Sequence, residues 1–241
     1  MNNFGTNIAD MYAGLMMIFL FVSISMLVET NKNQSEIDET KSKMTKIIYT
    51  KENLKQEIHK ALSDEFSKDL VKWNATIDND LTIRFQNPDL LFDNGSSELG
   101  DNYKEILGDF FPRYMAIVKT YGTSVASVSI DGHTSSTGWR DCTGDCSYFR
   151  NMYLSQQRSI NTLSHCWGLV ENMDKVFMKH KFVATGLSYS NPIYKKGDCP
   201  ENTEQGLDCQ VIDDEKSKRV EFTIKLENTD FTDSLELIAK K

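Results

Sequence analysis

The hydrophobic residues of this chain follow three different patterns. Residues 11–28 form an unbroken apolar block, MYAGLMMIFLFVSISMLV, without a charge or a proline. Residues 29–73 are rich in Lys, Glu, Asp, Asn and Gln, with an apolar residue at about every fourth position. From residue 75 onward, alternating and helical periodicities succeed one another. These patterns predict a membrane-spanning helix, a polar helical linker and a globular domain.

The apolar block is long enough to cross a bilayer. Eighteen helical residues span roughly 27 Å, close to the thickness of the hydrocarbon core. A buried core helix is the alternative, but such helices are usually shorter or amphipathic. A cleaved signal peptide fits poorly, because no Lys or Arg precedes Lys32 and no small-x-small cleavage site follows the block. We therefore predict an uncleaved transmembrane helix at residues 10–29, preceded by a short cytoplasmic tail at residues 1–9.

Two signals for the orientation of this helix disagree. Lysines follow the block but none precedes it, which by the positive-inside rule would keep most of the chain in the cytoplasm. All five cysteines lie beyond the block, which favours an oxidising compartment for the C-terminal part. The tail at residues 1–9 is too short and neutral to carry a strong signal. We therefore expect a single-pass protein whose C-terminal domain lies on the oxidising side of its membrane.

The linker at residues 30–74 has the period of one helix face, set by Leu54, Ile58, Leu62, Phe66 and Leu70. We predict a helical stalk that is broken or flexible near residues 29–43. Two interpretations of its apolar stripe remain open: a self-association seam, or a surface that packs on the following domain. The heptad pattern is too irregular to give an oligomeric state.

The globular domain is expected at residues 75–230, before a C-terminal tail at residues 231–241. Alternation predicts strands, and helical periodicity predicts two helices, the first interrupted by Pro112. The elements are a hairpin at 76–85 with an Asn-Asp turn, a helix at 98–121, a strand at 126–130, a helix at 154–170, and strands at 182–189 and 220–226. We summarise them as ββαβαβ, an α+β fold with helices packed on one sheet.

Composition excludes several classes of protein. The 241 residues include 27 basic and 35 acidic ones, giving a net charge of −8, and the basic residues do not cluster. Nucleic acid is therefore not an expected partner. An apolar content of 39% is that of a globular protein and excludes general disorder. No Ser-His-Asp arrangement, P-loop or paired-carboxylate hydrolase motif is present, so we do not expect an enzyme.

The five cysteines, at positions 142, 146, 166, 199 and 209, are candidates for disulfide bonds or metal binding. Cys199 and Cys209 close a short polar loop, and we predict a disulfide between them. The other three can form one further pair, which spacing does not select. A zinc site built from Cys142 and Cys146 with His165 or Cys166 is the alternative, but the spacing is unusual. We expect no metal.

Four sequence blocks resemble the OmpA-like peptidoglycan-binding domain and occur in that family's order. They are Phe92-Asp93-Asn94-Gly95-Ser96-Ser97-Glu98-Leu99, Ile130-Asp131-Gly132-His133-Thr134, Asn151-x-x-Leu154-Ser155-x-x-Arg158, and Lys218-Arg219-Val220-Glu221. Together they cover about 150 residues. The resemblance implies an OmpA-like periplasmic fold whose pocket holds the carboxylate and amine of the diamino acid in the peptidoglycan stem.

That resemblance also implies the binding residues. Arg158 matches the arginine that offers a two-pronged guanidinium to the carboxylate, and Asn151 and Leu154 match positions that shape the pocket. His133 is expected at the pocket edge, and Ser135 stands where the family has the aspartate that meets the ammonium. Asp141 and Asp145, in an insertion at residues 138–150, are candidates for the missing charge. The alternative for Arg158 is a structural salt bridge on its helix.

One span followed by an OmpA-like domain resembles the MotB family of ion-driven stator subunits. The segment Ala9-Asp10-Met11-Tyr12-Ala13-Gly14-Leu15-Met16-Met17 is similar to the start of that family's membrane helix, which implies that Asp10 carries a proton or a sodium ion. A helix cap at the membrane surface is the alternative. The resemblance further implies two copies of this chain inside a pentamer of a MotA-like membrane protein, with no other cofactor. It also implies a single-pass protein of the bacterial inner membrane with its C-terminal domain in the periplasm.

Within this family, the short N-terminal tail and Ser135 are more similar to the ZorB proteins of Zorya anti-phage defence, whose partner is a ZorA protein, than to flagellar MotB. Two alternatives remain. A passive cell-wall tether would have no use for Asp10. An ExbD-like energy transducer would have a smaller periplasmic domain without the Asn-x-x-Leu-Ser-x-x-Arg block.

Overall fold

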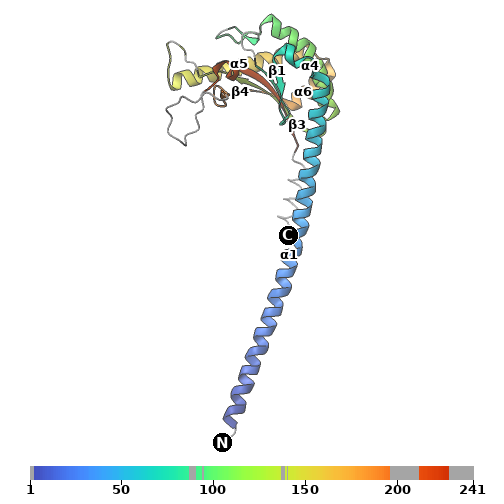
Figure 1. Ribbon diagram of the computed structural model, residues 1–241, viewed down its shortest axis with the longest axis vertical. Helices are drawn as coiled ribbons and strands as arrows, with labels where there is room; N and C mark the ends of the chain where they lie inside the picture. The colour runs from blue at the N-terminus through green and yellow to red at the C-terminus, as the bar shows by residue number, and fades with distance from the viewer. Residues whose placement is uncertain are drawn as a thin grey trace. The chain divides into compact units, whose positions relative to one another are not determined.

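The computed structural model describes residues 3–86, 91–93, 95–136, 139, 141–195 and 212–227, with side chains from residue 11 onward. The chain divides into two compact units. One comprises residues 1–50 with 229–241, and the other comprises residues 51–228. The first helix, α1 (Asn3–Phe66), contributes to both units (Figure 1).

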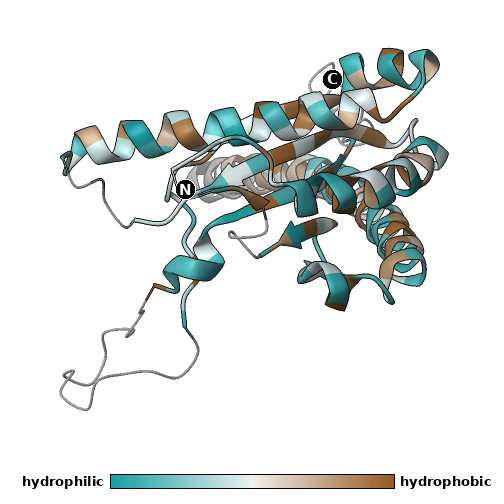
Figure 2. Cartoon of the chain, turned by 90° about the horizontal axis from the view of Figure 1, so that it is seen from above, coloured by the Kyte–Doolittle hydropathy of each residue, from teal (hydrophilic) through white to brown (hydrophobic). Residues whose placement is uncertain are grey.

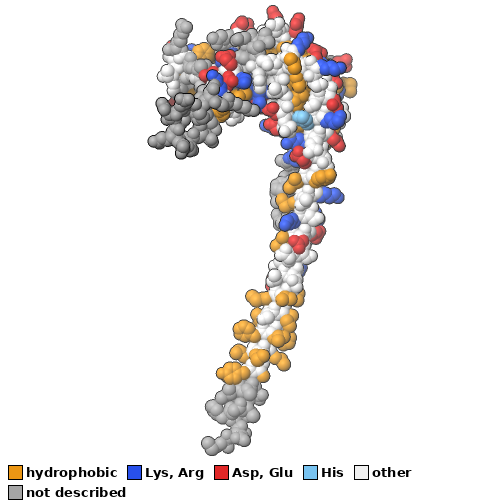
Figure 3. Space-filling model, viewed as in Figure 1, with side chains coloured by type: hydrophobic (Ala, Val, Ile, Leu, Met, Phe, Trp, Pro, Cys, Tyr) orange, Lys and Arg blue, Asp and Glu red, His pale blue; other side chains and the backbone are white. Residues whose placement is uncertain are grey.

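In the first unit, α1 is an unbroken helix whose apolar block is exposed on all sides. The large hydrophobic side chains between Met11 and Val28 are each more than half exposed. In Figure 3, hydrophobic side chains project to both sides of the lower coloured part of α1, and charged side chains begin above them. Among the described residues, this is the one helix long and apolar enough to cross a membrane. A helix that is apolar all round is stable where lipid surrounds it.

The predicted break near residues 29–43 is wrong, because α1 continues through it. This stretch contains no glycine or proline and is rich in Glu, Lys and Gln, which have high helix propensity. Side-chain pairs four residues apart add to its stability. Glu39 contacts Lys43 at 2.7 Å, and Gln34 donates a hydrogen bond to Asp38 at 3.2 Å.

In the second unit, the apolar stripe of α1 packs into the globular core. Ile58, Leu62 and Phe66 are completely buried. Arg113 fixes this end of the helix, since its Nε lies 2.6 Å from Glu65 Oε1 and its guanidinium lies 5.0 Å from the Phe66 ring centroid. The stripe therefore packs on its own domain, and of the two interpretations left open the intramolecular one is correct. A short helix, α2 (Leu70–Trp73), then leads into the sheet.

The sheet has five strands in the order β1-β2-β5-β3-β4. The strands are β1 (Ala75–Ile77), β2 (Thr82–Phe85), β3 (Val125–His133), β4 (Phe182–Gly186) and β5 (Arg219–Leu226). All neighbouring pairs are antiparallel except β3 and β4, which are parallel. The α+β class is confirmed, and each expected strand is present. The shorthand ββαβαβ is one strand short, because β5 follows β4 and pairs between β2 and β3.

Four more helices are described: α4 (Asp101–Thr120), α5 (Asp145–Gly168), α6 (Asn172–Lys181) and α7 (Asp214–Ser217). Two expectations about these helices are wrong: the interruption at Pro112 and the start of the helix expected at residue 154. Pro112 lies inside α4 without ending it, because the buried Phe110, Phe111 and Tyr114 hold both halves of the helix on the core. Helix α5 starts nine residues before the expected position 154, so it includes part of the insertion.

The core lies between the helices and one face of the sheet. Phe222 of β5 contacts Phe110 and Tyr114 of α4, with ring centroids 5.2 and 5.8 Å apart. Helix α5 packs on β3 and β4. Figure 2 shows hydrophobic and hydrophilic residues alternating along these helices, as expected when one side of each helix is buried. Since side chains alternate across a strand, the neighbours of Phe222 in sequence lie on the opposite face of the sheet.

Candidate functional site

Helix α5 is held unusually close to the ends of β3 and β4. A Cβ added to Gly132 would lie 2.4 Å from the backbone oxygen of Ser155, and one added to Gly186 would lie 2.4 Å from the backbone nitrogen of Gln156. Ser155 Oγ accepts a 3.0 Å hydrogen bond from the Ser188 backbone N–H, and Ser159 Oγ donates a 2.7 Å hydrogen bond to Thr185 O. This close approach fixes the rotation of α5 and therefore the direction of its other side chains.

Arg158 is the most deeply buried cation of this helix, at 7% exposure. Its Nε donates a 2.9 Å hydrogen bond to Ser96 O, and one terminal nitrogen lies 3.5 Å from Asp93 O. Its guanidinium carbon lies 4.7 Å from the Phe92 ring centroid. Burial lowers the pKa of Arg158 to about 10, so the side chain remains a cation at neutral pH.

The surroundings of Arg158 suit an anionic ligand. Among the described residues no carboxylate forms an ion pair with it, so the salt-bridge alternative finds no support there. Backbone carbonyls of the Phe92–Ser97 loop satisfy only part of its donor set, which has five N–H groups. A buried cation held only by neutral partners gains most from a carboxylate that approaches its free edge.

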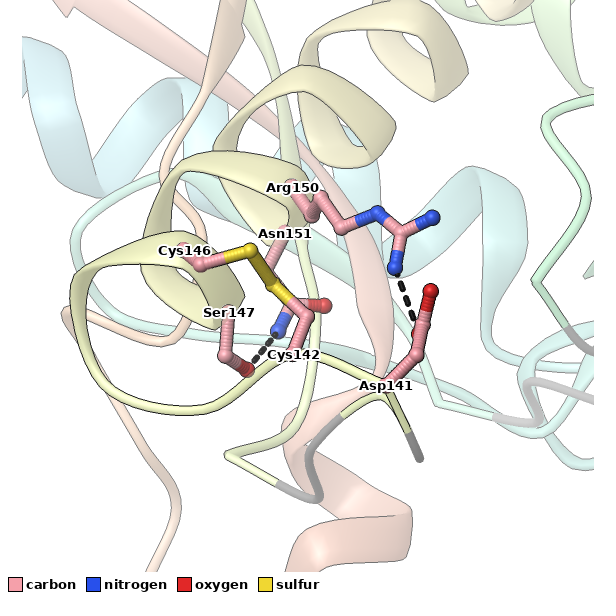
Figure 4. The surroundings of a disulfide bond; sticks show 6 residues. All are labelled: Asp141, Cys142, Cys146, Ser147, Arg150 and Asn151. Carbon is pink, nitrogen blue, oxygen red and sulfur yellow. Dashed lines mark hydrogen bonds and ion pairs between the residues drawn. A yellow bond between two sulfur atoms is a disulfide. The ribbon is translucent and has the colours of Figure 1, made fainter.

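Asn151 and Leu154 lie about two turns and one turn, respectively, before Arg158 on α5. Asn151 is buried, and its Nδ2 lies 3.5 Å from Ser147 Oγ (Figure 4). Leu154 is half-buried and lines a groove on the outer side of the helix. The two residues therefore serve different surfaces: Asn151 faces the domain, and Leu154 faces the groove.

His133 and Ser135 belong to a second set, at the end of β3. His133 is 2% exposed, and its Nε2 lies 3.3 Å from Glu221 Oε2. Ser135 is also buried. Thus α5 holds three of the five predicted peptidoglycan-binding residues, whereas His133 contacts the polar face of the sheet.

Glu221 is the centre of a charged network that the sequence analysis did not identify. Its Oε1 accepts hydrogen bonds from Arg84 Nε at 2.6 Å and from Arg219 Nε at 2.5 Å, and Arg84 also contacts Asp78 at 2.8 Å. Burial opposes ionisation of Glu221, but His133 and Arg219 outweigh it and hold the pKa of Glu221 well below its usual range. The sequence signal was the alternation of charged and apolar residues in 219–222.

Neither candidate for the missing acidic charge is seen at the Arg158 pocket. Asp141 Oδ1 accepts a 2.7 Å hydrogen bond from Arg150, which lowers the pKa of Asp141 (Figure 4). Its charge is therefore already compensated. Asp145 is exposed in the first turn of α5.

The described cysteines do not form the zinc site that the sequence left as an alternative. Cys142 and Cys146 form a disulfide, and Cys166 is a free thiol buried in the core (Figure 4). The zinc alternative is therefore wrong for these residues, and the described part of the chain holds no cluster of three metal-ligating side chains. The predicted Cys199–Cys209 pair lies outside the described residues, as does the side chain of Asp10.

A groove of about 590 Å³ lies beside the Arg158 loop. Its lining comprises Gly95, Ser97, Trp139, Cys146, Phe149, Arg150, Tyr153, Leu154 and Gln157. Of this set, the sequence analysis assigned only Leu154 to ligand binding. A signal for the groove was present in the sequence. Phe149 and Tyr153 are four residues apart in an otherwise polar helical segment, so their side chains lie on the same face.

Comparison with known proteins then identifies the chain. No protein-family model matches it. Solved structures of similar fold include a MotB-like protein from Desulfovibrio vulgaris (19% identity, 73% of this chain, 93% of that chain, TM-score 0.47) and the cell wall anchor of the T6SS from Pseudomonas aeruginosa (17%, 69%, 97%, TM-score 0.44).

The sequence relationship is much stronger. The chain is 40% identical over 199 residues to the Zorya protein ZorB from Escherichia coli (strain Crooks), and the match covers 81% of both proteins. The chain belongs to the ZorB family.

Proposed function

We propose that this chain is the membrane-embedded anchor subunit of an ion-driven motor, in which the C-terminal domain holds peptidoglycan and Asp10 carries the ion. Arg158 is the observation that most supports the anchor. It is a buried cation without a carboxylate partner among the described residues, on the helix that carries Asn-x-x-Leu-Ser-x-x-Arg. Membership of the ZorB family supports a role for this function in Zorya defence.

The anchor requires recognition of a charged group in the cell wall. The Phe92–Ser97 loop leaves part of the N–H groups of the Arg158 guanidinium available. The free carboxylate of the stem diamino acid would accept hydrogen bonds from these groups. Because charge-assisted bonds to a planar guanidinium are directional, they select a carboxylate over a neutral amide. With Ser135 in place of the family's aspartate, the ammonium of the ligand would meet a hydroxyl instead of a charge.

The ion path requires a second protein. A single span cannot enclose a path, so two copies of this chain would lie inside a pentamer of a ZorA-type membrane protein. Asp10 precedes an 18-residue block without another charge. A carboxylate at the edge of a low-dielectric region has a raised cost of ionisation and can therefore load and release a cation as its surroundings change. In this role the chain performs no enzymatic reaction.

Binding to isolated peptidoglycan sacculi tests the anchor. The full-length chain in detergent is co-sedimented with sacculi, comparing wild type with Arg158→Ala and Arg158→Lys. We expect Arg158→Ala to lower the affinity at least tenfold, and Arg158→Lys to bind with intermediate affinity because it keeps the charge and loses the planar fork.

Lys68→Ala is the matched control, since Lys68 is an exposed cation distant in sequence from α5. Circular dichroism confirms that each variant is folded. Undiminished binding by a folded Arg158→Ala protein would contradict the anchor site.

A further inference from the structure

The groove beside Arg158 has rings that are exposed but firmly held. Phe149 and Tyr153 are 67% and 69% exposed, although they project from the stable helix α5. Exposed aromatic rings that lie together along a groove form an apolar patch of the kind that marks a binding site. Trp139 completes the lining and is half-buried.

The insertion that carries Trp139 is anchored at three points. The Cys142 backbone N–H donates a 3.2 Å hydrogen bond to Trp139 O, and Cys142 is joined to Cys146 of α5 by the disulfide. Arg150 lies 4.7 Å from the Trp139 ring centroid while it holds Asp141. Figure 4 shows the disulfide tying the insertion to the first turn of α5, with the Arg150–Asp141 pair beside it. The groove is therefore pre-formed, which reduces the entropy cost of binding.

The groove is continuous with the loop that holds Arg158. Gly95 and Ser97 line the groove, and Ser96 between them accepts the hydrogen bond from Arg158 Nε. From Phe149 to Arg158 the helix rises about 13 Å at 1.5 Å per residue, so the lining extends away from Arg158 along α5. A ligand bound at Arg158 would therefore continue into the groove.

We propose that this groove binds the glycan strand of peptidoglycan, next to the stem peptide held by Arg158; the inference rests on the proposed attachment to peptidoglycan. Sugar rings have apolar C–H faces and hydroxyl edges. The negative face of an aromatic ring attracts the C–H face, while Arg150, Gln157 and Ser97 offer hydrogen bonds to the edges. A volume of about 590 Å³ is in the range of small-ligand sites.

A second copy of this chain is the less suitable occupant. A stable protein interface needs about 800 Å² from each partner. The charged Arg150–Asp141 pair beside the groove, with Asp141 strongly exposed, is typical of a wet surface and not of an apolar dimer core.

Calorimetric binding of defined fragments tests the inference with the full chain in nanodiscs. The probes are a stem tripeptide ending in the diamino acid, and the same tripeptide attached to its disaccharide. We expect the wild type to bind the disaccharide–tripeptide at least tenfold more tightly. Tyr153→Ala and Trp139→Ala should each remove about tenfold of that affinity and change tripeptide binding less than twofold.

Tyr194→Ala is the matched control, because Tyr194 is a partly exposed tyrosine outside the groove lining; it should change neither affinity. Equal wild-type affinity for the two probes would overturn the glycan site and leave the anchor intact. No binding of either probe by the wild type would contradict the anchor itself. Loss of self-association in Tyr153→Ala, measured by sedimentation with unchanged fragment binding, would assign the groove to a second copy and overturn the inference.

Discussion

At the scale of single residues, the two charged centres of this domain differ in how they are neutralised. Glu221 is surrounded by Arg84, Arg219 and His133. Arg158 has only carbonyls and an aromatic ring among its described contacts. A buried charge that is already paired stabilises one arrangement of the fold, whereas one without a counter-ion is available to a ligand. We therefore expect Glu221 to stabilise the fold, and the proposed binding role falls to Arg158.

Glu221→Gln should make stability less dependent on pH. The folded pKa of Glu221 lies below its unfolded value of 4.5, so its contribution is present above pH 4.5 and is lost as the pH falls through the folded pKa. We expect the variant to lose about 3 kcal/mol of unfolding free energy at pH 7, since a buried network loses one partner. The difference from wild type should shrink in denaturant titrations at pH 3.

Glu215→Gln is the control, because Glu215 is exposed and pairs only with Lys218 in the described part of the chain. It should cost less than about 1 kcal/mol at either pH. Parallel wild-type and Glu221→Gln curves across this pH range would refute the role assigned to Glu221.

Gly132→Ala should separate α5 from β3. The added Cβ would meet the Ser155 backbone oxygen at 2.4 Å and Ser159 Oγ at 2.6 Å, and a backbone atom cannot rotate away. We expect a loss of about 2 kcal/mol or more in denaturant unfolding, together with weaker binding to sacculi. Gly108→Ala in α4, where the added Cβ has open space, should instead be stabilising by about 0.5–1 kcal/mol. The opposite order of the two variants would contradict the close packing.

At the scale of elements, the periodicity of the sequence correctly predicted those helices and strands whose formation depends on local sequence. The five strands and the helical stripe at Leu54–Phe66 follow from spacing alone. Where tertiary packing decides, the prediction failed: α4 continues through Pro112, and α5 starts at Asp145. The insertion gave no period, since its order depends on the Cys142–Cys146 disulfide, which spacing did not select.

The candidate site was predicted in the same uneven way. Arg158, Asn151 and Leu154 follow from one motif on one helix, and the structure places all three on α5. The groove combines α5 with Trp139 and the Gly95–Ser97 loop, which are distant in sequence. The Glu221 network joins β2, β3 and β5 through strand pairings that no local pattern encodes.

Leu62→Ala tests where the stripe of α1 packs. Leu62 is completely buried within the second unit, so truncation should leave a cavity and lower the unfolding free energy by about 2–5 kcal/mol. Ile48→Ala is the control on the same helix, since Ile48 is 66% exposed; it should change stability by less than about 0.5 kcal/mol. If Leu62→Ala instead weakened self-association in sedimentation without loss of stability, the stripe would be a seam between copies.

At the scale of the whole molecule, one chain joins a membrane-length helix to a domain that holds the buried cation Arg158. Helix α1 is continuous from Asn3 to Phe66, and its last part is built into the core of the second unit. The proposed anchor would therefore carry its membrane segment and its peptidoglycan-binding residues in one chain.

Ion flux tests the central claim most directly. Proton and sodium flux is measured in cells that express this chain with the proposed ZorA-type partner, comparing wild type with Asp10→Asn. Asp38→Asn, an acid of α1 beyond the apolar block, is the matched control. The account predicts flux in the wild type and in Asp38→Asn, and none in Asp10→Asn. Flux that is absent from the wild type, or unchanged by Asp10→Asn, would contradict the account and make the protein a passive cell-wall tether.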